Sequence, residues 1–193
     1  QLNEKEKINW KGHHRPSINN LGVYPRPYQD RLPIWVAVGG TPESVIRAGK
    51  YGLPMALAII GGMPSRFAPL AQLYRNSAMK AGHAIDQLQL GINSHVFIGK
   101  KKKKAADDFY PPYADVMTRL GKERGWSPMD RQHFEAMRGH DGALLVGSHQ
   151  QVIDKILYEH ELFGNTRFLA QMSVGTMPHD KLMHSIELFG TKV

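Results

Sequence analysis

The sequence has no cysteine and no long apolar run, and each absence excludes a class of protein. Without cysteine the chain has no disulfide framework, no thiolate zinc site and no cysteine nucleophile. No segment approaches the ~20 apolar residues of a membrane span, and the charged start QLNEKEKINW lacks the apolar core of a signal peptide. We therefore expect a cytoplasmic protein without a membrane partner. The initial Gln in place of Met predicts a processed or truncated chain.

Acidic residues are few relative to basic ones. The 193 residues include 25 Lys+Arg and 17 Asp+Glu, a formal net charge of +8. Five of the basic residues form one run, Lys100 to Lys104, and without them the balance is 20 − 17 = +3. Asp107 and Asp108 follow the run and oppose an anionic ligand. We interpret the run as a solvated loop or helix start, with nucleic-acid binding as a minor alternative.

Motifs for metal binding and nucleophilic hydrolysis are missing as well. The 10 histidines include no H-E-x-x-H pair, and no third ligand accompanies His179 and His184, so we predict no metal site. No G-x-S-x-G is present, which argues against a serine hydrolase. His95 lies in an apolar strand run and is interpreted as a core histidine, with acid–base chemistry as the alternative. No catalytic residue is assigned.

The chain changes character near residue 34. Residues 1–33 show no sustained period and carry four prolines, which is typical of an irregular connector. Beyond them, apolar runs predict four strands near residues 34, 55, 92 and 168, each followed by a helical pattern. Residues 121–142 form a glycine-rich excursion with one short helix near 131–137. The run 144–146 then leads into a helix with a capping box at Ser148 and Gln151.

Alternating strands and helices predict parallel pairing through right-handed crossovers, and therefore an α/β protein with helices outside the sheet. Two architectures fit this order: an open doubly wound sheet and part of a (β/α)8 barrel. The pattern alone does not choose between them. Within the helical segment 105–120, Pro111 and Pro112 are expected to kink or split the helix.

A glycine-rich turn after the first of these strands is the strongest candidate site. Gly39 and Gly40 permit close approach of a ligand to the backbone, and the next helix starts with Thr41 as N-cap and Pro42 at its first position. A helix N-terminus favours anions, and the hydroxyls of Thr41 and Ser44 suit phosphate oxygens. The alternative is a capped helix after a tight turn, because neither a Walker A nor a G-x-G-x-x-G pattern is present.

Several segments, in order and spacing, resemble the bacterial luciferase-like monooxygenases. They are VYPRPYQ (23–29), LPIWVAVGGTP (32–42) and AGKYGLPM (48–55), followed by GALLVGS (142–148), RFL (167–169) and IELFG (186–190). The family has a (β/α)8 fold of the TIM-barrel type. The resemblance implies that residues 34–193 supply about four βα units, strands 5 to 8 of the barrel. The excursion at 121–142 then corresponds to part of the family's insertion before the last strand.

The resemblance also implies a flavoprotein. The family holds the flavin phosphate at the loop after the fifth strand, which corresponds here to Gly39, Gly40, Thr41 and Ser44. The flavin ring is expected near Ile60 and Gly61. The implied cofactor is reduced FMN supplied by a separate flavin reductase, with deazaflavin F420 as the alternative, and the reaction oxidises a small organic substrate with O₂.

Much of the family's reaction centre belongs to the first half of the barrel, so the resemblance assigns no catalytic residue to this chain. A half-barrel also has open edge strands, which tend to self-associate. We therefore expect a homodimer. An inactive half-barrel that self-associates is the alternative function.

Overall fold

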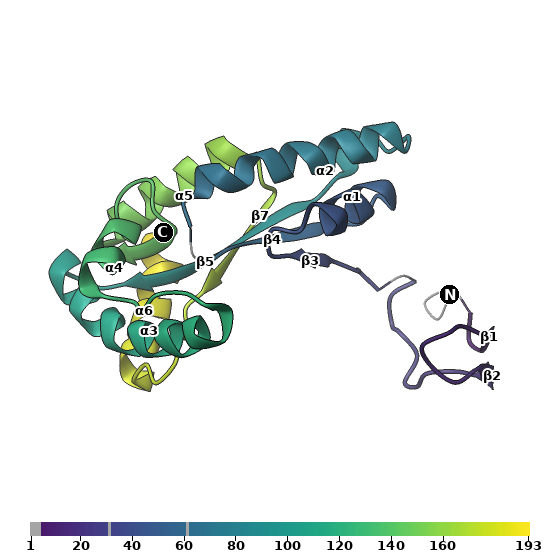
Figure 1. Cartoon of the computed structure of the whole chain (residues 1–193), viewed down its shortest axis with the longest axis horizontal. Coiled ribbons are helices and arrows are strands. Elements are labelled where there is room, and N and C mark those ends of the chain that lie inside the picture. Colours follow the sequence, from purple (N-terminus) through teal and green to yellow (C-terminus); the bar gives the residue numbers. More distant parts are fainter. Residues whose placement is uncertain (1–4, 31, 61) are drawn as a thin grey trace. The chain divides into compact units, whose positions relative to one another are not determined.

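The computed structural model describes residues 5–30, 32–60 and 62–193 (Figure 1). The chain divides into two compact units, Gln1–Ile34 and Trp35–Val193. Within the described residues, no helix combines the length and the apolar character needed to cross a membrane. The candidate site lies in the second unit.

The first unit contains a short antiparallel pair of strands, β1 (Ile8–Trp10) and β2 (Ile18–Leu21). The Asn20 amide donates to the Asn9 side chain at 2.8 Å, and the Tyr24 hydroxyl donates to Glu6 at 2.7 Å. The sequence predicts only an irregular connector here, and the two short strands are a difference from that prediction. Strands of three and four residues are too short to show an alternating pattern in the sequence.

The second unit is built on a five-stranded parallel sheet. Its order is β3-β4-β5-β6, with β7 paired to β5. The α/β class with parallel strands is confirmed, but the expected count of four strands is wrong. The additional strand is β6, which stands outside the predicted count because its apolar run is only three residues long. The strands are β3 (Val36–Val38), β4 (Met55–Ile59), β5 (Leu90–Ile98), β6 (Leu144–Gly147) and β7 (Arg167–Gln171).

Strand β5 is paired along both edges. Strand β7 lies along one edge, and β4 and then β6 lie one after the other along the opposite edge. Residues 91–95 of β5 pair with β7, and its residues 90–94 pair with β4. His95 pairs with Gln171 of β7 and also with Leu144, the first residue of β6, so the second pairing uses the opposite edge. Strand β6 therefore continues along β5 from the point where β4 ends.

In the part of the chain that the structure describes, six α-helices occur where the sequence predicts helical segments, and α3 is longer than expected. Helix α3 runs through Pro111 and Pro112 as a single element, so these prolines do not split it. Pro112 is buried, as are Phe109 and Tyr113 of the same helix. The helices are α1 (Pro42–Lys50), α2 (Ala68–Lys80), α3 (Lys102–Arg124), α4 (Arg131–Met137), α5 (His149–Phe163) and α6 (His179–Lys192), with 3₁₀ turns at Pro64–Phe67 and Ile85–Gln87.

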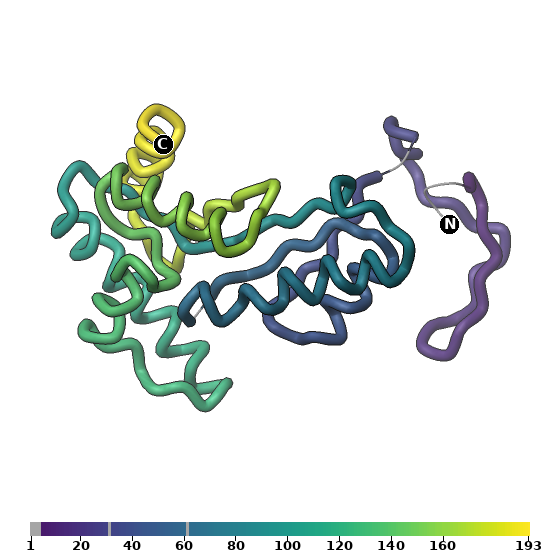
Figure 2. The backbone as a smooth tube through the Cα atoms, turned by 90° about the horizontal axis from the view of Figure 1, so that it is seen from above, coloured from purple at the N-terminus to yellow at the C-terminus, as the bar shows by residue number. Residues whose placement is uncertain are grey.

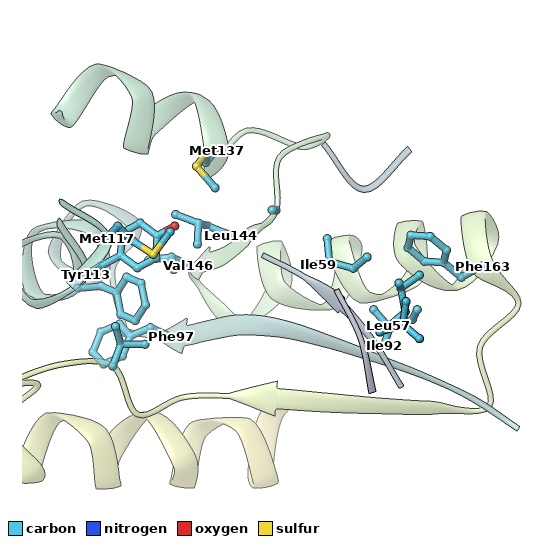
Figure 3. Close-up of a cluster of buried hydrophobic side chains, with 14 of the residues drawn as sticks. Leu57, Ile59, Ile92, Phe97, Tyr113, Met117, Met137, Leu144, Val146 and Phe163 are labelled. Atoms are coloured by element: carbon cyan, nitrogen blue, oxygen red, sulfur yellow. The ribbon is translucent and has the colours of Figure 1, made fainter. Parts of the chain in front are cut away.

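Helices α1 and α2 pack side by side along the β3–β4 part of the sheet (Figures 1 and 2). At the other end, β5 has helices on both faces. Phe97 packs against Phe109 of α3 with ring centroids 5.5 Å apart, while Val96 packs on the opposite side with residues of α5 and α6. Figure 3 shows Leu57, Ile92 and Phe163 in one part of the main core and Phe97 in the other.

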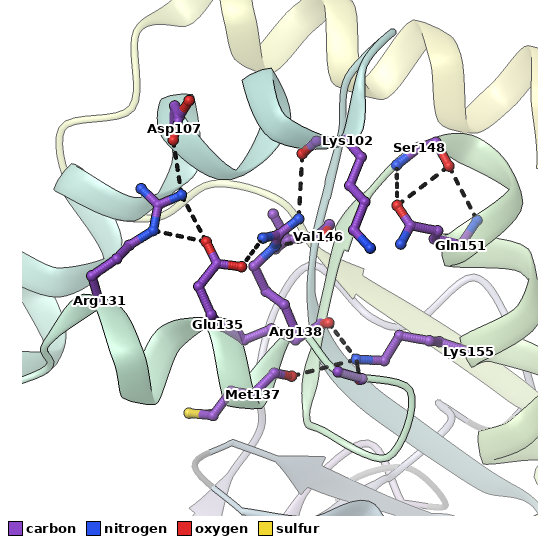
Figure 4. A network of polar contacts seen from close by, with 12 residues as sticks. Lys102, Asp107, Arg131, Glu135, Met137, Arg138, Val146, Ser148, Gln151 and Lys155 are labelled. Atoms are coloured by element: carbon purple, nitrogen blue, oxygen red, sulfur yellow. Dashed lines mark hydrogen bonds and ion pairs between the residues drawn. The ribbon is translucent and has the colours of Figure 1, made fainter.

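Helix α5 carries two buried ionisable side chains, Lys155 and Glu159. The Ser94 hydroxyl hydrogen-bonds the Glu159 carboxyl, with distances of 3.0 and 3.1 Å to its two oxygens. Lys155 Nζ donates to the backbone oxygens of Leu144 at 2.5 Å, Gly139 at 2.9 Å and Met137 at 3.4 Å (Figure 4). Burial raises the pKa of Glu159 to about 7 and lowers the pKa of Lys155 to about 8. Lys155 thereby ties the end of α4 and strand β6 to α5.

The raised pKa of Glu159 predicts a stability that depends on pH. The folded state favours the protonated acid, so wild-type stability decreases as pH rises from about 4.5, the unfolded value, to about 7. Glu159→Gln keeps a neutral acceptor for Ser94 and removes this titration. We expect the stability of E159Q relative to wild type to rise by about 3 kcal/mol across that window. Urea unfolding at pH 4.5, 5.5, 6.5 and 7.5 measures the difference, and a difference that stays flat contradicts the prediction.

Candidate functional site

The carboxyl ends of β3 and β4 lie at the same edge of the sheet. Val36 is in register with Met55, and Val38 with Leu57. The loops that follow the two strands therefore start side by side, at the edge where ligands collect in parallel α/β folds.

The backbone at Gly39 and Gly40 faces open space. A side-chain Cβ built on either glycine meets no heavy atom within 4 Å. Gly40 has φ +127°, a conformation that residues with a side chain rarely adopt. The glycines thus leave room for a ligand to contact the main chain directly.

The hydroxyl groups of Thr41 and Ser44, at the start of α1, are able to donate hydrogen bonds to a ligand. Thr41 occupies the N-cap position, as the sequence predicts, but its side chain makes no capping hydrogen bond. The backbone oxygen of Thr41 instead accepts from the amides of Ser44 at 3.1 Å and Val45 at 3.3 Å. The Ser44 hydroxyl oxygen accepts from Arg47 at 3.2 Å, which leaves the hydroxyl hydrogen of Ser44 to donate. The acid of the first turn, Glu43, is exposed to solvent, where its charge is screened.

A cavity of about 310 Å³ joins this loop to the segment after β4. Gly40 lines it from one side, and Arg66 brings an exposed guanidinium from the turn before α2. Gly62 and Arg66 are not among the predicted site residues. The sequence did contain a signal for this part of the site, the second Gly-Gly pair at 61–62, which follows a predicted strand. Adjacent parallel strands bring the loops that follow them together, so this pair could have been placed beside Gly40. The lining residues are Gly40, Gly62, Arg66, Phe67, Pro69 and Leu70.

Four of the predicted site residues lie near one another, but not all of them line the cavity. Gly39, Gly40, Thr41 and Ser44 share one loop and helix start, and of these Gly40 lines the cavity. Ile60 follows the end of β4, half-buried against the main core. Gly61 lies outside the described residues.

His95 is a buried core residue, which agrees with the preferred interpretation of the sequence. Its side chain is 5% exposed, and burial lowers its pKa to about 4, so the ring is neutral at physiological pH. The ring lies edge-on to Tyr113 with centroids 5.5 Å apart. The Tyr113 hydroxyl is buried without a hydrogen-bond partner among the described residues. Neither side chain lines the cavity at Gly40.

The sequence profile of the luciferase-like monooxygenases matches residues 1–166. The chain belongs to this family. No curated protein gives a significant match.

Solved structures with the same fold include luciferase-like enzymes of several activities. A monooxygenase from Streptomyces bottropensis is 20% identical, with a TM-score of 0.76, and is matched over 100% of this chain and 56% of its own. The oxygenating constituent of 3,6-diketocamphane monooxygenase from Pseudomonas putida, solved with FMN, is 17% identical with a TM-score of 0.68, over 100% of this chain and 58% of its own.

A third structure uses a different cofactor. The coenzyme F420-dependent tetrahydromethanopterin reductase from Methanopyrus kandleri is 17% identical with a TM-score of 0.73, over 100% of this chain and 59% of its own. The luciferase-like chain described here therefore spans less than two thirds of the length of these structures. Its sheet corresponds to part of their TIM-barrel fold, which confirms the barrel rather than the doubly wound alternative.

Proposed function

We propose that this chain provides the flavin-phosphate site of a luciferase-like monooxygenase that uses reduced FMN and acts on a small organic substrate. The observation that carries the proposal is the open space in front of Gly39 and Gly40 at the start of α1. A phosphate there accepts hydrogen bonds from backbone amides at the positive end of the helix dipole.

Three kinds of group in this part of the chain fit a phosphate. Gly40 permits the backbone to approach its oxygens, and the hydroxyls of Thr41 and Ser44 supply neutral donors. Arg66 lines the same cavity as Gly40 and supplies a cation. When bound, reduced flavin supplies the electrons for oxidation of the substrate by O₂. The role of these residues is to hold and orient the cofactor through its phosphate.

The free edges of the sheet support two further parts of the proposal, the completion of the barrel and the homodimer. Strands β3 and β7 each pair with one neighbour among the described residues, so each has a free edge. A closed (β/α)8 barrel has no free edges. We propose that these edges pair with further strands of the barrel, and they equally support the homodimer of a self-associating half-barrel. A separate flavin reductase remains the proposed source of reduced cofactor.

Substitution of Gly40 tests the phosphate site. Gly40→Val places a side chain in the open space, and we expect FMN affinity to fall about ten-fold or more, as for loss of a charge-assisted hydrogen bond. Riboflavin, which has no phosphate, is expected to bind wild type more weakly than FMN does and to lose little affinity in the variant. Fluorescence titration with FMN, riboflavin and F420 measures each affinity and decides between the two cofactors.

Gly82→Val is the matched control. Gly82 also has a positive φ, +83°, and open space around its Cβ position, but it lies after α2 and outside the cavity. Both variants therefore place a valine at a positive φ with open space around its Cβ. Equal loss of FMN affinity in the two variants, or equal affinity of wild type for FMN and riboflavin, contradicts the proposed site.

A further inference from the structure

A second cavity, of about 560 Å³, lies at the carboxyl end of β5 between the starts of α3 and α6. It shares no lining residue with the cavity at Gly40. Its volume lies within the range of about 300–1,000 Å³ typical of small-molecule sites. The lining residues are Phe97, Ile98, Gly99, Lys100, Lys101, Lys104, Asp108, Asp180, Lys181 and His184.

The walls of this cavity are fixed by contacts of the fold. The buried Ser185 hydroxyl of α6 accepts a hydrogen bond from the Ile98 amide at 2.8 Å, which holds α6 against the end of β5. On the other side, a Cβ at Gly99 would lie 3.0 Å from the Cβ of Ala105, so the strand end passes close to α3. The two helix starts are therefore held at a defined separation around the cavity.

The lysines of the cavity outnumber its carboxylates. Asp108 is held by two of them, Lys181 at 2.7 Å and Lys104 at 3.1 Å. No carboxylate among the described residues lies within ion-pair distance of Lys100 or Lys101. With Asp180 counted, the four lysines and two carboxylates give the lining a formal charge of +2.

The start of α3 adds to this positive charge. The helix begins inside the lysine run, with Lys101 at its N-cap, no capping side-chain bond and no acid in its first turn. Lysines at this position repel the positive end of the helix dipole. By contrast, α4 and α5 are capped by Asp130 and Ser148. A bound anion would relieve the repulsion at α3.

We propose that this cavity binds a phosphate monoester of a small organic molecule, with Lys100 and Lys101 as the main contacts of the phosphate. The two lysines without acidic partners match the two charges of a phosphate monoester at neutral pH, whereas a carboxylate carries one. Phe97, Ile98 and the aliphatic stems of the lysines offer an apolar surface for the organic part. The site gives a role to three lysines of the run, Lys100, Lys101 and Lys104, which the flavin-phosphate proposal leaves unused.

The test uses the full chain and 2-naphthyl phosphate as the probe, with inorganic phosphate and 2-naphthol as its two halves. We expect the whole probe to bind more tightly than either half in calorimetric titration. The double variant K100A/K101A is expected to weaken probe binding about ten-fold or more. Asp108→Asn frees Lys104 and Lys181 and is expected to strengthen it.

K102A/K103A is the matched control, because it removes the same charge from the same run at two residues that do not line the cavity. We expect its affinity to stay within two-fold of wild type. Equal weakening in both double variants would show that binding follows total charge, as for nucleic acid, and would overturn the proposal. Equal affinity for the probe and for inorganic phosphate would also overturn it. Because the readout is binding at β5, failure here is distinguishable from failure of the FMN titration at Gly40.

Discussion

Lys155→Met is expected to lower the free energy of unfolding by about 3–5 kcal/mol, the usual result of removing one partner from a buried charged network. The Lys155 side chain is 5% exposed and donates to three backbone oxygens. Methionine fills a similar volume but leaves those oxygens without this donor and Glu159 without a nearby cation. Urea denaturation at pH 7.5 measures the loss, and Lys122→Met, at an exposed position of α3, is the control, with an expected change near zero.

A double-mutant cycle separates the two causes of that loss. In K155M/E159Q neither buried charge remains, so the part of the cost due to an uncompensated carboxyl disappears. We expect the double variant to regain some stability relative to K155M while remaining below wild type, because the oxygens of Gly139 and Leu144 still lack the lysine donor. A K155M variant as stable as wild type would mean that Lys155 does not secure β6 to α5.

Gly49→Ala is expected to destabilise the second unit by about 2–3 kcal/mol, through overpacking where α1 meets α2. A Cβ at Gly49 would lie 2.6 Å from the Tyr74 backbone oxygen, 2.8 Å from Ser77 Cβ and 3.0 Å from the Ala78 amide nitrogen. Two of these are backbone atoms, which cannot turn aside as a flexible side chain can. The helices must separate, and the buried contacts of Val45 and Ala48 loosen with them.

Gly190→Ala provides the matched comparison for this prediction. Gly190 lies inside α6, and a Cβ built there meets nothing within 4 Å. Alanine in an open helical position stabilises by about 0.5–1 kcal/mol relative to glycine. The same substitution is thus expected to change thermal unfolding in opposite directions at the two sites. A stabilised G49A variant would show that α1 and α2 are not in the close contact described.

Local signals made much of this fold predictable from the sequence. The short helix at Arg131–Met137 and the capping box at Ser148 and Gln151 are found where they were predicted, because both depend on residues within one or two turns. The count of four strands leaves out β6, because the three apolar residues of that strand carry no period. The pairing of His95 with two strands joins residues far apart in the chain, which no local pattern records.

In the candidate site, too, local features could be predicted from the sequence and long-range ones could not. The positive φ of Gly40 and the position of Pro42 at the start of α1 depend only on neighbouring residues, so both could be predicted. The approach of Arg66 to Gly40 depends on the register between β3 and β4, so the sequence alone gave no reason to select that arginine. The cavity beside the lysine run could not be predicted, because the residues that line it opposite the run, Asp180, Lys181 and His184, come from α6.

The two-sided pairing of β5 has a consequence for the order in which the protein assembles during synthesis. Strand β4 precedes β5 in the chain, so residues 90–94 meet their first partner as soon as they are made. Residues 95–98 have no neighbour on that edge until translation reaches 144–147, and the opposite edge waits until 167–171. The central strand of the sheet is therefore among the last to be fully enclosed, and the growing chain presents an edge of this strand to solvent, or to a chaperone, until translation reaches residue 171.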